Sequence, residues 1–318
     1  MGASTSDTSP AGLPPVVVLT GPTAAGKSAL AISLARRFAG ELINADSQQV
    51  YRYMDLGTAK PTAEQRALAP HHLIDIADPD EQFNAGRYAA EARAVLAALH
   101  AQGRLPILVG GTGLYIRAAL EGLGGAAGRN DGIRRALEDE HAEALRAGDA
   151  LRLHRRLAAL DAPSAARLHP NDSRRVIRAL EIHAVSGRRP SELRSAACAP
   201  RYRVLHLALD PGGEELQRRI AARCDAMIEA GLLREVRGLR RRGYGPELPA
   251  MRAIGYRHMQ PVMDGADTLA NVLPAMKRDT WRLVRRQRTW LRGIPAVQWF
   301  DPRDEASVLR SVAAFAGA

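Results

Sequence analysis

Cysteine is nearly absent from this 318-residue chain, which contains only Cys198 and Cys224. Neither residue lies in a CxxC pair or a Cys/His cluster, so we expect no disulfide framework and no zinc site. The chain also lacks a run of about 18 apolar residues, the length that a membrane-spanning helix needs. Residues 1–13 lack the basic start and long apolar stretch of a secretory signal. We therefore expect a cytoplasmic protein with a disordered tail at 1–13 and no membrane association.

Lysine is also scarce, because only Lys27, Lys60 and Lys277 occur among the 45 basic residues. A genomic preference for arginine codons accounts for the bias. It also makes Lys27 informative, since such a chain retains lysine most readily where a compact ammonium group is required. The formal net charge is +11, which indicates a polyanionic partner such as a nucleic acid.

Strand patterns alternate with helical patterns along most of the chain. Strands are expected at 14–20, 41–46, 105–111, 202–209 and 296–300. Helices are expected at 27–40, 85–103, 212–230 and roughly 270–291. This alternation is typical of a parallel sheet covered by helices. Between 131 and 194 only helical patterns occur. The sequence therefore predicts an α/β core at 14–121 and 199–318, interrupted by an all-helical insertion at 122–198.

The stretch GPTAAGKS at 21–28 matches G-x-x-x-x-G-K-[ST] directly after an expected strand and before an expected helix. Gly21 and Gly26 permit the tight turn that directs backbone N–H groups inward, and the helix adds its positive N-terminal end. Lys27 can reach the terminal phosphate, and the Ser28 hydroxyl can ligate Mg²⁺. The stretch therefore predicts a phosphate-binding loop whose members are Gly21, Pro22, Thr23, Ala24, Ala25, Gly26, Lys27 and Ser28.

Such a loop recognises a diphosphate group rather than a particular nucleotide. A P-loop ATPase carries an acid at the tip of a later strand, but the third strand here ends ILVGGTG. Instead, Asp46 follows the short second strand. Two interpretations of Asp46 remain open at this point: a general base for an entering nucleophile, or an N-cap for the segment that follows.

Several motifs together resemble the tRNA dimethylallyltransferase family, also called tRNA isopentenyltransferase. They are GPTAAGKS, NADSQQVYRYMDLGTAKP, HHLID, LVGGTGLYIRAALEGL, HPNDSRRVIRALE, RAIGYR and RRQRTWLR, in this order from residue 16 to about 300. The resemblance implies a P-loop kinase-like fold that does not use ATP. It also implies transfer of a dimethylallyl group from dimethylallyl diphosphate to the exocyclic amine (N6) of the adenosine 3′ to the anticodon, with release of diphosphate and with Mg²⁺ as cofactor.

The resemblance also implies roles for particular residues. Asp46 would be the general base, while Arg223 and Thr23 would act on the leaving diphosphate. Without the family, Arg223 would be interpreted as a charge on a solvated helix face, and Thr112 as a helix N-cap. The residues that the resemblance adds as tRNA contacts are Asp46, Ser47, Gln48, Gln49, Thr112, Arg134, Val176, Ile177, Gly255 and Gln287.

Two basic segments are candidates for contact with RNA phosphates. Residues 174–194 carry a net charge of +4, and residues 277–292 carry +6 with tryptophans interleaved. A solvated, arginine-rich helix face is the alternative. RAIGYR at 252–257 offers a tyrosine that either stacks on a base or packs inside. The expected contacts are Arg174, Arg175, Arg178, Arg252, Tyr256, Arg257, Arg285, Arg286, Arg288, Trp290 and Arg292.

The sequence therefore predicts a monomeric prenyl transferase that acts on tRNA. A P-loop small-molecule kinase is one alternative, and it would need an ATP site and no RNA surface. A non-catalytic tRNA-binding protein is another, and it would tolerate loss of Asp46.

Overall fold

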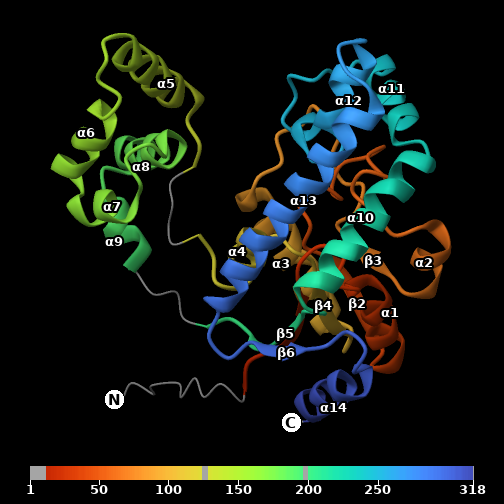
Figure 1. The fold of residues 1–318 in the computed structure, drawn as a ribbon. Coiled ribbons are helices and arrows are strands. Elements are labelled where there is room, and N and C mark those ends of the chain that lie inside the picture. The colour runs from red at the N-terminus through yellow and green to blue at the C-terminus, as the bar shows by residue number, and fades with distance from the viewer. Residues whose placement is uncertain (1–11, 124–127, 196–199, 318) are drawn as a thin grey trace, which may run out of the picture. The chain divides into compact units, whose positions relative to one another are not determined.

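The computed structural model describes residues 12–123, 128–195 and 200–317 (Figure 1). The expected tail at 1–13 lies almost wholly outside these residues, and so does Cys198. The chain divides into two compact units. One comprises residues 1–120 and 200–318, and the other residues 121–199. These boundaries lie within two residues of the expected ones.

The first unit contains a six-stranded parallel sheet with strand order β3-β2-β4-β1-β5-β6. Its strands are β1 (Pro15–Thr20), β2 (Gly40–Asn44), β3 (His71–His72), β4 (Leu105–Val109), β5 (Arg203–Leu209) and β6 (Gln298–Phe300). The central strand β1 pairs with β4 and β5, and Val16 to Leu19 are fully buried. The α/β fold class is confirmed. Because all pairs are parallel, the loops after the strands meet at one edge of the sheet.

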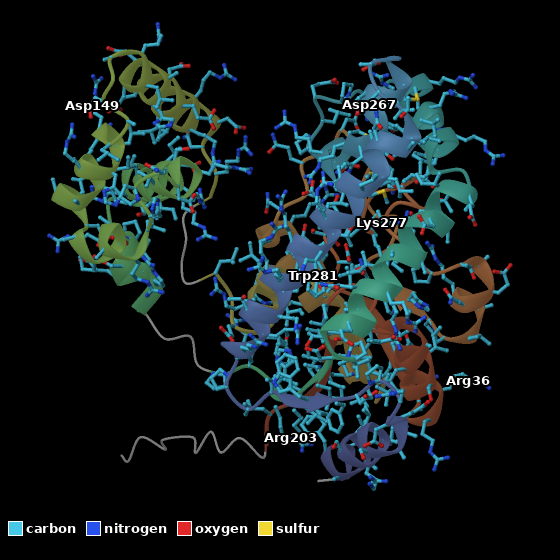
Figure 2. The ribbon with its side chains drawn as sticks, in the orientation of Figure 1. Arg36, Asp149, Arg203, Asp267, Lys277 and Trp281 are labelled. Atoms are coloured by element: carbon cyan, nitrogen blue, oxygen red, sulfur yellow. The ribbon has the colours of Figure 1, made fainter. Side chains whose placement is uncertain are left out.

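Helices cover this sheet in the first unit (Figure 1). They are α1 (Lys27–Arg37), α2 (Ala63–Leu68), α3 (Ala85–Ala101), α4 (Gly113–Leu120), α10 (Gly213–Glu229), α11 (Leu232–Arg241), α12 (Tyr256–Met263), α13 (Leu269–Arg292) and α14 (Glu305–Ala316). The long α13 packs against α10, α12 and α4. Lys277 and Trp281 lie on it (Figure 2), and Lys277 forms an ion pair of 2.6 Å with Asp225 of α10.

Gly40 has a different role from the expected one. The helix 27–40 was predicted to stop at Gly40, but α1 ends at Arg37 and Ala39 adopts the left-handed conformation with φ 48°. Gly40 instead opens β2, where a Cβ atom would lie 2.7 Å from the carbonyl oxygen of Leu105. The glycine is therefore required by the close pairing of β2 with β4 rather than by the end of the helix.

The second unit is all-helical in its described residues, as the sequence predicts. It contains α5 (Asp131–Arg146), α6 (Arg152–Leu160), α7 (Ala162–Arg167), α8 (Ser173–Ser186) and α9 (Pro190–Ser195). Two residues that were expected to contact tRNA have buried side chains in this unit. Val176 and Ile177 of α8 are only 1% and 5% exposed and lie in the unit's hydrophobic cluster. Their side chains hold α8 in place and do not face a partner.

Glu181 organises the polar part of this unit. Its fully buried carboxylate pairs with Arg134 at 2.5 Å and with Arg178 at 2.9 Å, and it accepts a hydrogen bond from the Asn130 N–H. Burial alone would raise the pKa of Glu181, but the two guanidinium groups hold it below its usual value. Arg134 and Arg178, both expected to contact tRNA, are thus engaged with an acid of their own unit.

Replacing Glu181 should destabilise the second unit. Glu181→Ala removes a buried carboxylate that neutralises two arginine guanidinium groups, a change that costs about 3 kcal/mol. Since the folded-state pKa is lowered, the wild-type contribution is present above the unfolded pKa and is lost as pH falls through the folded value. Hydrogen exchange of α5 and α8 in the full chain measures both effects, with α3 as the internal reference.

Glu140→Ala is the matched control, because Glu140 pairs with Arg156 on the surface of the same unit. It should change the unfolding free energy by less than about 1 kcal/mol. Equal effects of the two substitutions would contradict a structural role for Glu181.

Candidate phosphate and nucleic-acid site

The loop after β1 has the geometry that the phosphate-binding motif predicts. Gly21 and Gly26 have φ values of 142° and 96°, and Ala24 between them has φ 65°. A Cβ atom on Gly21 would lie 2.5 Å from the carbonyl oxygen of Leu209, so a larger residue would displace β5. Gly26 is the N-cap of α1, which places the first turn of this helix at the end of the loop. The loop therefore presents backbone N–H groups and a helix N-terminus to an anion.

Lys27 lies over this loop. Its Nζ donates hydrogen bonds to the carbonyl oxygens of Gly21 at 2.9 Å and Pro22 at 2.8 Å. Burial lowers the pKa of Lys27 to about 8, with Asp46 opposing the shift and Arg223 adding to it. Two neutral carbonyls only partly compensate a half-buried ammonium group, so an anionic ligand would stabilise its charged form.

Asp46 combines the two interpretations that the sequence left open. Its Oδ1 accepts a hydrogen bond from the Gln48 N–H at 2.8 Å, so it does cap the following turn. Its own N–H is held by Asn44 Oδ1 at 3.1 Å. Within the described residues Oδ2 has no recorded hydrogen bond. Asp46 thus has one oxygen that fixes its orientation and a second one that can accept a proton.

Arg223 projects from α10 into the same region. Burial lowers the pKa of its guanidinium group, while the charge of Asp46 opposes the shift. In the part of the chain that the structure describes, Arg223 forms no hydrogen bond or ion pair. A desolvated guanidinium group without a protein partner is suited to bind an anion.

Thr23 of the loop, Asp46 and Arg223 line one cavity of about 390 Å³ in the first unit. Its polar lining includes Thr23, Asp46, Ser47, Gln48, Thr58, Thr112, Arg223, Arg252, Arg257, Thr280 and Gln287. Its apolar lining includes Ile220, Cys224, Met227, Ala253, Ile254, Met276 and Leu283. The apolar residues come from α10, α13 and the segment before α12, and no local sequence pattern indicates this combination.

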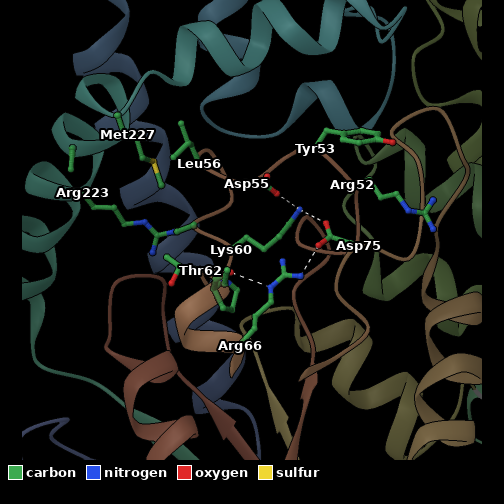
Figure 3. A pocket seen from close by; sticks show the side chains of 15 residues that line it. Arg52, Tyr53, Asp55, Leu56, Lys60, Thr62, Arg66, Asp75, Arg223 and Met227 are labelled. Atoms are coloured by element: carbon green, nitrogen blue, oxygen red, sulfur yellow. Dashed lines mark hydrogen bonds and ion pairs between the residues drawn. The ribbon is translucent and has the colours of Figure 1, made fainter. Parts of the chain in front are cut away.

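A second cavity of about 710 Å³ shares Arg223 and Met227 with the first one (Figure 3). Lys60 lies beside it with Nζ 2.6 Å from both Asp55 Oδ1 and Asp75 Oδ1 (Figure 3). The Tyr51 carbonyl oxygen is a third acceptor at 2.8 Å. Unlike Lys27, Lys60 is therefore fully engaged with protein groups and fixes this segment of the chain.

The Thr112 side chain joins two loops and is not the helix N-cap that its position suggested. Its hydroxyl oxygen accepts a hydrogen bond from the Ser47 N–H at 3.0 Å and does not cap α4. It joins the loop after β4 to the loop after β2 at the wall of the smaller cavity. Gln49 is also structural, because its Nε2 donates to the carbonyl oxygens of Thr58 and Ala59.

Tyr256 does not stack on a base, because its side chain is fully buried. Its hydroxyl donates to Glu235 Oε1 at 2.6 Å, and the same carboxylate accepts the N–H groups of Leu56 and Gly57. Burial and the Glu235 charge raise the pKa of Tyr256 strongly. Glu235 shapes the loop that carries Gly57 into the cavity. Sequence analysis missed it, since a lone acid in an arginine-rich helix gives no signal.

The expected RNA-contacting residues divide into exposed and engaged groups. Arg288 is engaged, because its Nε lies 2.9 Å from Asp210 Oδ2 at the end of β5. Trp290 packs over Gly113, and Gly255 is buried. Arg257 is exposed but paired with Asp279. Arg175 is also exposed, and its Nε lies 3.4 Å from Asp172 Oδ2. The remaining exposed ones are Arg174, Arg252, Arg285, Arg286 and Arg292.

Ser28 and Asp46 offer oxygen donors to a metal ion. Within the described residues no group of three or more His, Cys, Asp or Glu side chains could hold a metal ion. His71 and His72 form the short edge strand β3. Ser28 is exposed in the first turn of α1, and Asp46 lies in the adjoining cavity. Such a set suits an ion that takes most of its ligands from a bound diphosphate and water.

None of the described helices is both long enough and apolar enough to span a membrane. The phosphate-binding loop, the parallel sheet and the cavity together define a P-loop α/β protein that acts on a phosphorylated substrate.

Comparisons with known proteins identify the family within this class. A family model described as IPP transferase matches residues 49–294. A tRNA dimethylallyltransferase of Anaeromyxobacter dehalogenans (strain 2CP-C) is 51% identical over 289 residues, which cover 90% of this chain and 95% of the relative. One from Syntrophobacter fumaroxidans is 48% identical, covering 91% and 84%.

Solved structures that resemble this chain belong to the same family. The tRNA isopentenylpyrophosphate transferase of Bacillus halodurans superposes with a TM-score of 0.70 at 37% identity, covering 95% of this chain and 96% of the other. A eukaryotic dimethylallyltransferase acting on tRNA gives a TM-score of 0.78 at 29% identity, covering 95% and 77%. The chain belongs to the tRNA dimethylallyltransferase family, as its motifs predict.

The lowered pKa of Lys27 makes anion binding dependent on pH. Sulfate is a suitable probe because it stays doubly charged across the range. Its affinity should be constant below pH 8 and should fall as pH rises through about 8, because Lys27 then loses its proton. Lys27→Met should weaken binding and remove this pH dependence. A wild-type profile that stays flat to pH 10 would contradict the assignment, and titration calorimetry provides the measurement.

Proposed function

We propose that the protein transfers a dimethylallyl group from dimethylallyl diphosphate to N6 of the adenosine 3′ to the anticodon in tRNA, releasing diphosphate. One observation carries the proposal: Thr23 of the phosphate loop, Asp46 and the unpaired Arg223 line a single cavity with an apolar wall. Membership of the family supports it. We also propose that the enzyme acts as a monomer, in the cytoplasm where tRNA is found.

The reaction forms a bond between the adenine nitrogen and the first allyl carbon. The bond from that carbon to the diphosphate oxygen breaks, and the diphosphate takes the electron pair. The amine is a poor nucleophile and must lose a proton as the new bond forms. Asp46 Oδ2 can accept this proton, while Oδ1 remains bonded to the Gln48 N–H. General base catalysis of this kind contributes about 10²–10⁴-fold.

The leaving diphosphate gains negative charge as its bond to carbon breaks. Loop amides, Lys27 and Arg223 can stabilise this charge, and their effect is strong because the groups are already desolvated. Mg²⁺ would supply further charge neutralisation, held by Ser28 and the phosphate oxygens with Asp46 nearby. The Thr23 N–H belongs to the same loop and faces the cavity region.

The cavity wall separates two chemical environments. The apolar side chains of α10 and α13 suit a five-carbon allyl group, and the exposed Arg252 and Arg257 at the lining suit the RNA. The volume of about 390 Å³ lies within the range for small ligands, about 300–1,000 Å³. A stacked base could not enter it, so the target adenosine must be extruded from the RNA.

The decisive assay combines purified protein, anticodon stem-loop RNA and labelled dimethylallyl diphosphate, with ATP as the competing substrate. The label should move to the RNA, and ATP should be neither hydrolysed nor inhibitory at equal concentration. Hydrolysis of ATP stimulated by RNA, without transfer of the label, would favour a kinase-like function instead.

The Asp46→Asn variant gives this assay its internal control. Asparagine preserves the side-chain shape and the bond from the Gln48 N–H, but it cannot accept a proton. Single-turnover transfer should fall by about 10² or more, with diphosphate affinity little changed. Near-normal transfer would show that Asp46 is only a cap.

The exposed arginines on α13 and α8 should determine the salt dependence of RNA binding. Arg285→Gln with Arg286→Gln, or Arg174→Gln with Arg175→Gln, should flatten the log–log slope by about 0.7–0.9 per lost phosphate contact. Turnover at saturating RNA should change little, since these exposed side chains lie outside the cavity lining. Binding across a salt series is the measurement. An unchanged slope in both double variants would mean that RNA binds elsewhere.

A further inference from the structure

Gln287 of α13 bonds to two loops that are far from it in sequence. Its Oε1 accepts a hydrogen bond from the Thr23 N–H at 2.9 Å, and its Nε2 donates to the Gly111 carbonyl oxygen at 3.2 Å. A backbone donor on one side and a backbone acceptor on the other fix the orientation of the amide group. A single side chain thus joins α13 to the phosphate loop after β1 and to the loop after β4.

The glycines of the GGTG segment (residues 110–113, after β4) leave space for this contact. A Cβ atom on Gly111 would lie 2.2 Å from Gln287 Nε2, and one on Gly113 would lie 2.1 Å from Trp290 Cε2. Both side chains of α13 therefore occupy space that only glycine leaves open. The ion pair between Arg288 and Asp210 attaches the same turn of α13 to the end of β5.

The contact connects two binding surfaces. Arg285 and Arg286, one and two residues before Gln287, are exposed on α13. The Thr23 N–H on the other side belongs to the loop that would hold the diphosphate. An RNA that shifts this turn of α13 changes the acceptor of the Thr23 N–H, and a ligand that shifts the loop acts on α13 in return.

We propose that Gln287 is a positioning residue that holds the phosphate loop from α13, so that RNA and diphosphate bind with coupled affinities. The proposal rests on the proposed function for the identity of the two ligands. It assigns Gln287 to the loop rather than to direct contact with RNA. Linkage requires the coupling to be reciprocal: RNA must change diphosphate affinity by the same factor as diphosphate changes RNA affinity.

The test measures the affinity of inorganic diphosphate with and without saturating anticodon stem-loop RNA, and the affinity of the RNA in return. Gln287→Met keeps the side-chain length but removes both hydrogen bonds. We expect about tenfold weaker diphosphate binding without RNA, the loss that two hydrogen bonds predict. The coupling factor should fall to one, RNA affinity alone should stay unchanged, and KM for the allyl diphosphate should rise.

Gly111→Ala is the second variant, because its methyl group displaces Gln287 without altering α13. It should reproduce the loss of coupling. Thr289→Val is the matched control on the same helix. Its exposed hydroxyl bonds only to the Arg285 carbonyl, so diphosphate affinity should not change. Circular dichroism and thermal unfolding establish that each variant is folded.

The outcomes distinguish the two proposals. Loss of RNA affinity alone in Gln287→Met would show that the side chain contacts RNA and would overturn the positioning role. Unchanged diphosphate affinity in both folded variants would also overturn it. If the wild type binds diphosphate in a Gln287-dependent way but transfers no allyl group, the proposed function fails and the positioning role stands.

Discussion

The site depends on half-buried charges that the protein does not neutralise by itself. Lys27 has only loop carbonyls as partners, and Arg223 has no partner among the described residues. Asp46 influences both charges without a direct ion pair to either in the described part of the chain. Lys60 shows the contrast, since two aspartates and a carbonyl saturate it. Leaving Lys27 and Arg223 unsatisfied costs stability, and a bound diphosphate is the ligand that would offset this cost.

The parallel sheet determines which residues can meet these charges. Residues after β1, β2, β4 and β5 arrive at one edge, and these are the loop, Asp46, the GGTG segment and Asp210. Short side-chain bridges then fix the loops relative to one another. Thr112 binds the Ser47 N–H, and Gln287 binds the Thr23 N–H. The contacts that set the site geometry are therefore made mainly by polar side chains to backbone groups, which leaves the charged groups available for ligands.

Local signals explain what could be predicted from the sequence. The phosphate loop, the core strands and the helical insertion follow from glycine positions and apolar periodicity, and the structure contains all of them. The roles expected for Gly40 and Tyr256 were wrong because these residues are governed by tertiary contacts. Gly40 is a glycine because of Leu105, and Tyr256 is buried because Glu235 binds its hydroxyl. No pattern in a single segment contains that information. The apolar wall of the cavity was missed for the same reason, because its residues come from separate helices.

The net charge of a segment does not show which of its arginines are available to bind RNA. The two basic segments have a large positive net charge, but some of their arginines form ion pairs within the protein and others are exposed to solvent. Arg178 is engaged with Glu181, and Arg288 with Asp210. Arg174, Arg285 and Arg286 are exposed instead, and Arg175 is exposed with a longer ion pair of 3.4 Å to Asp172. An arginine that releases counterions on binding RNA must be solvated beforehand, so only the second group can contribute fully to a salt-dependent affinity. The first group keeps α8 and α13 at fixed positions, and this allows the exposed arginines on the same helices to present their charges in a defined arrangement.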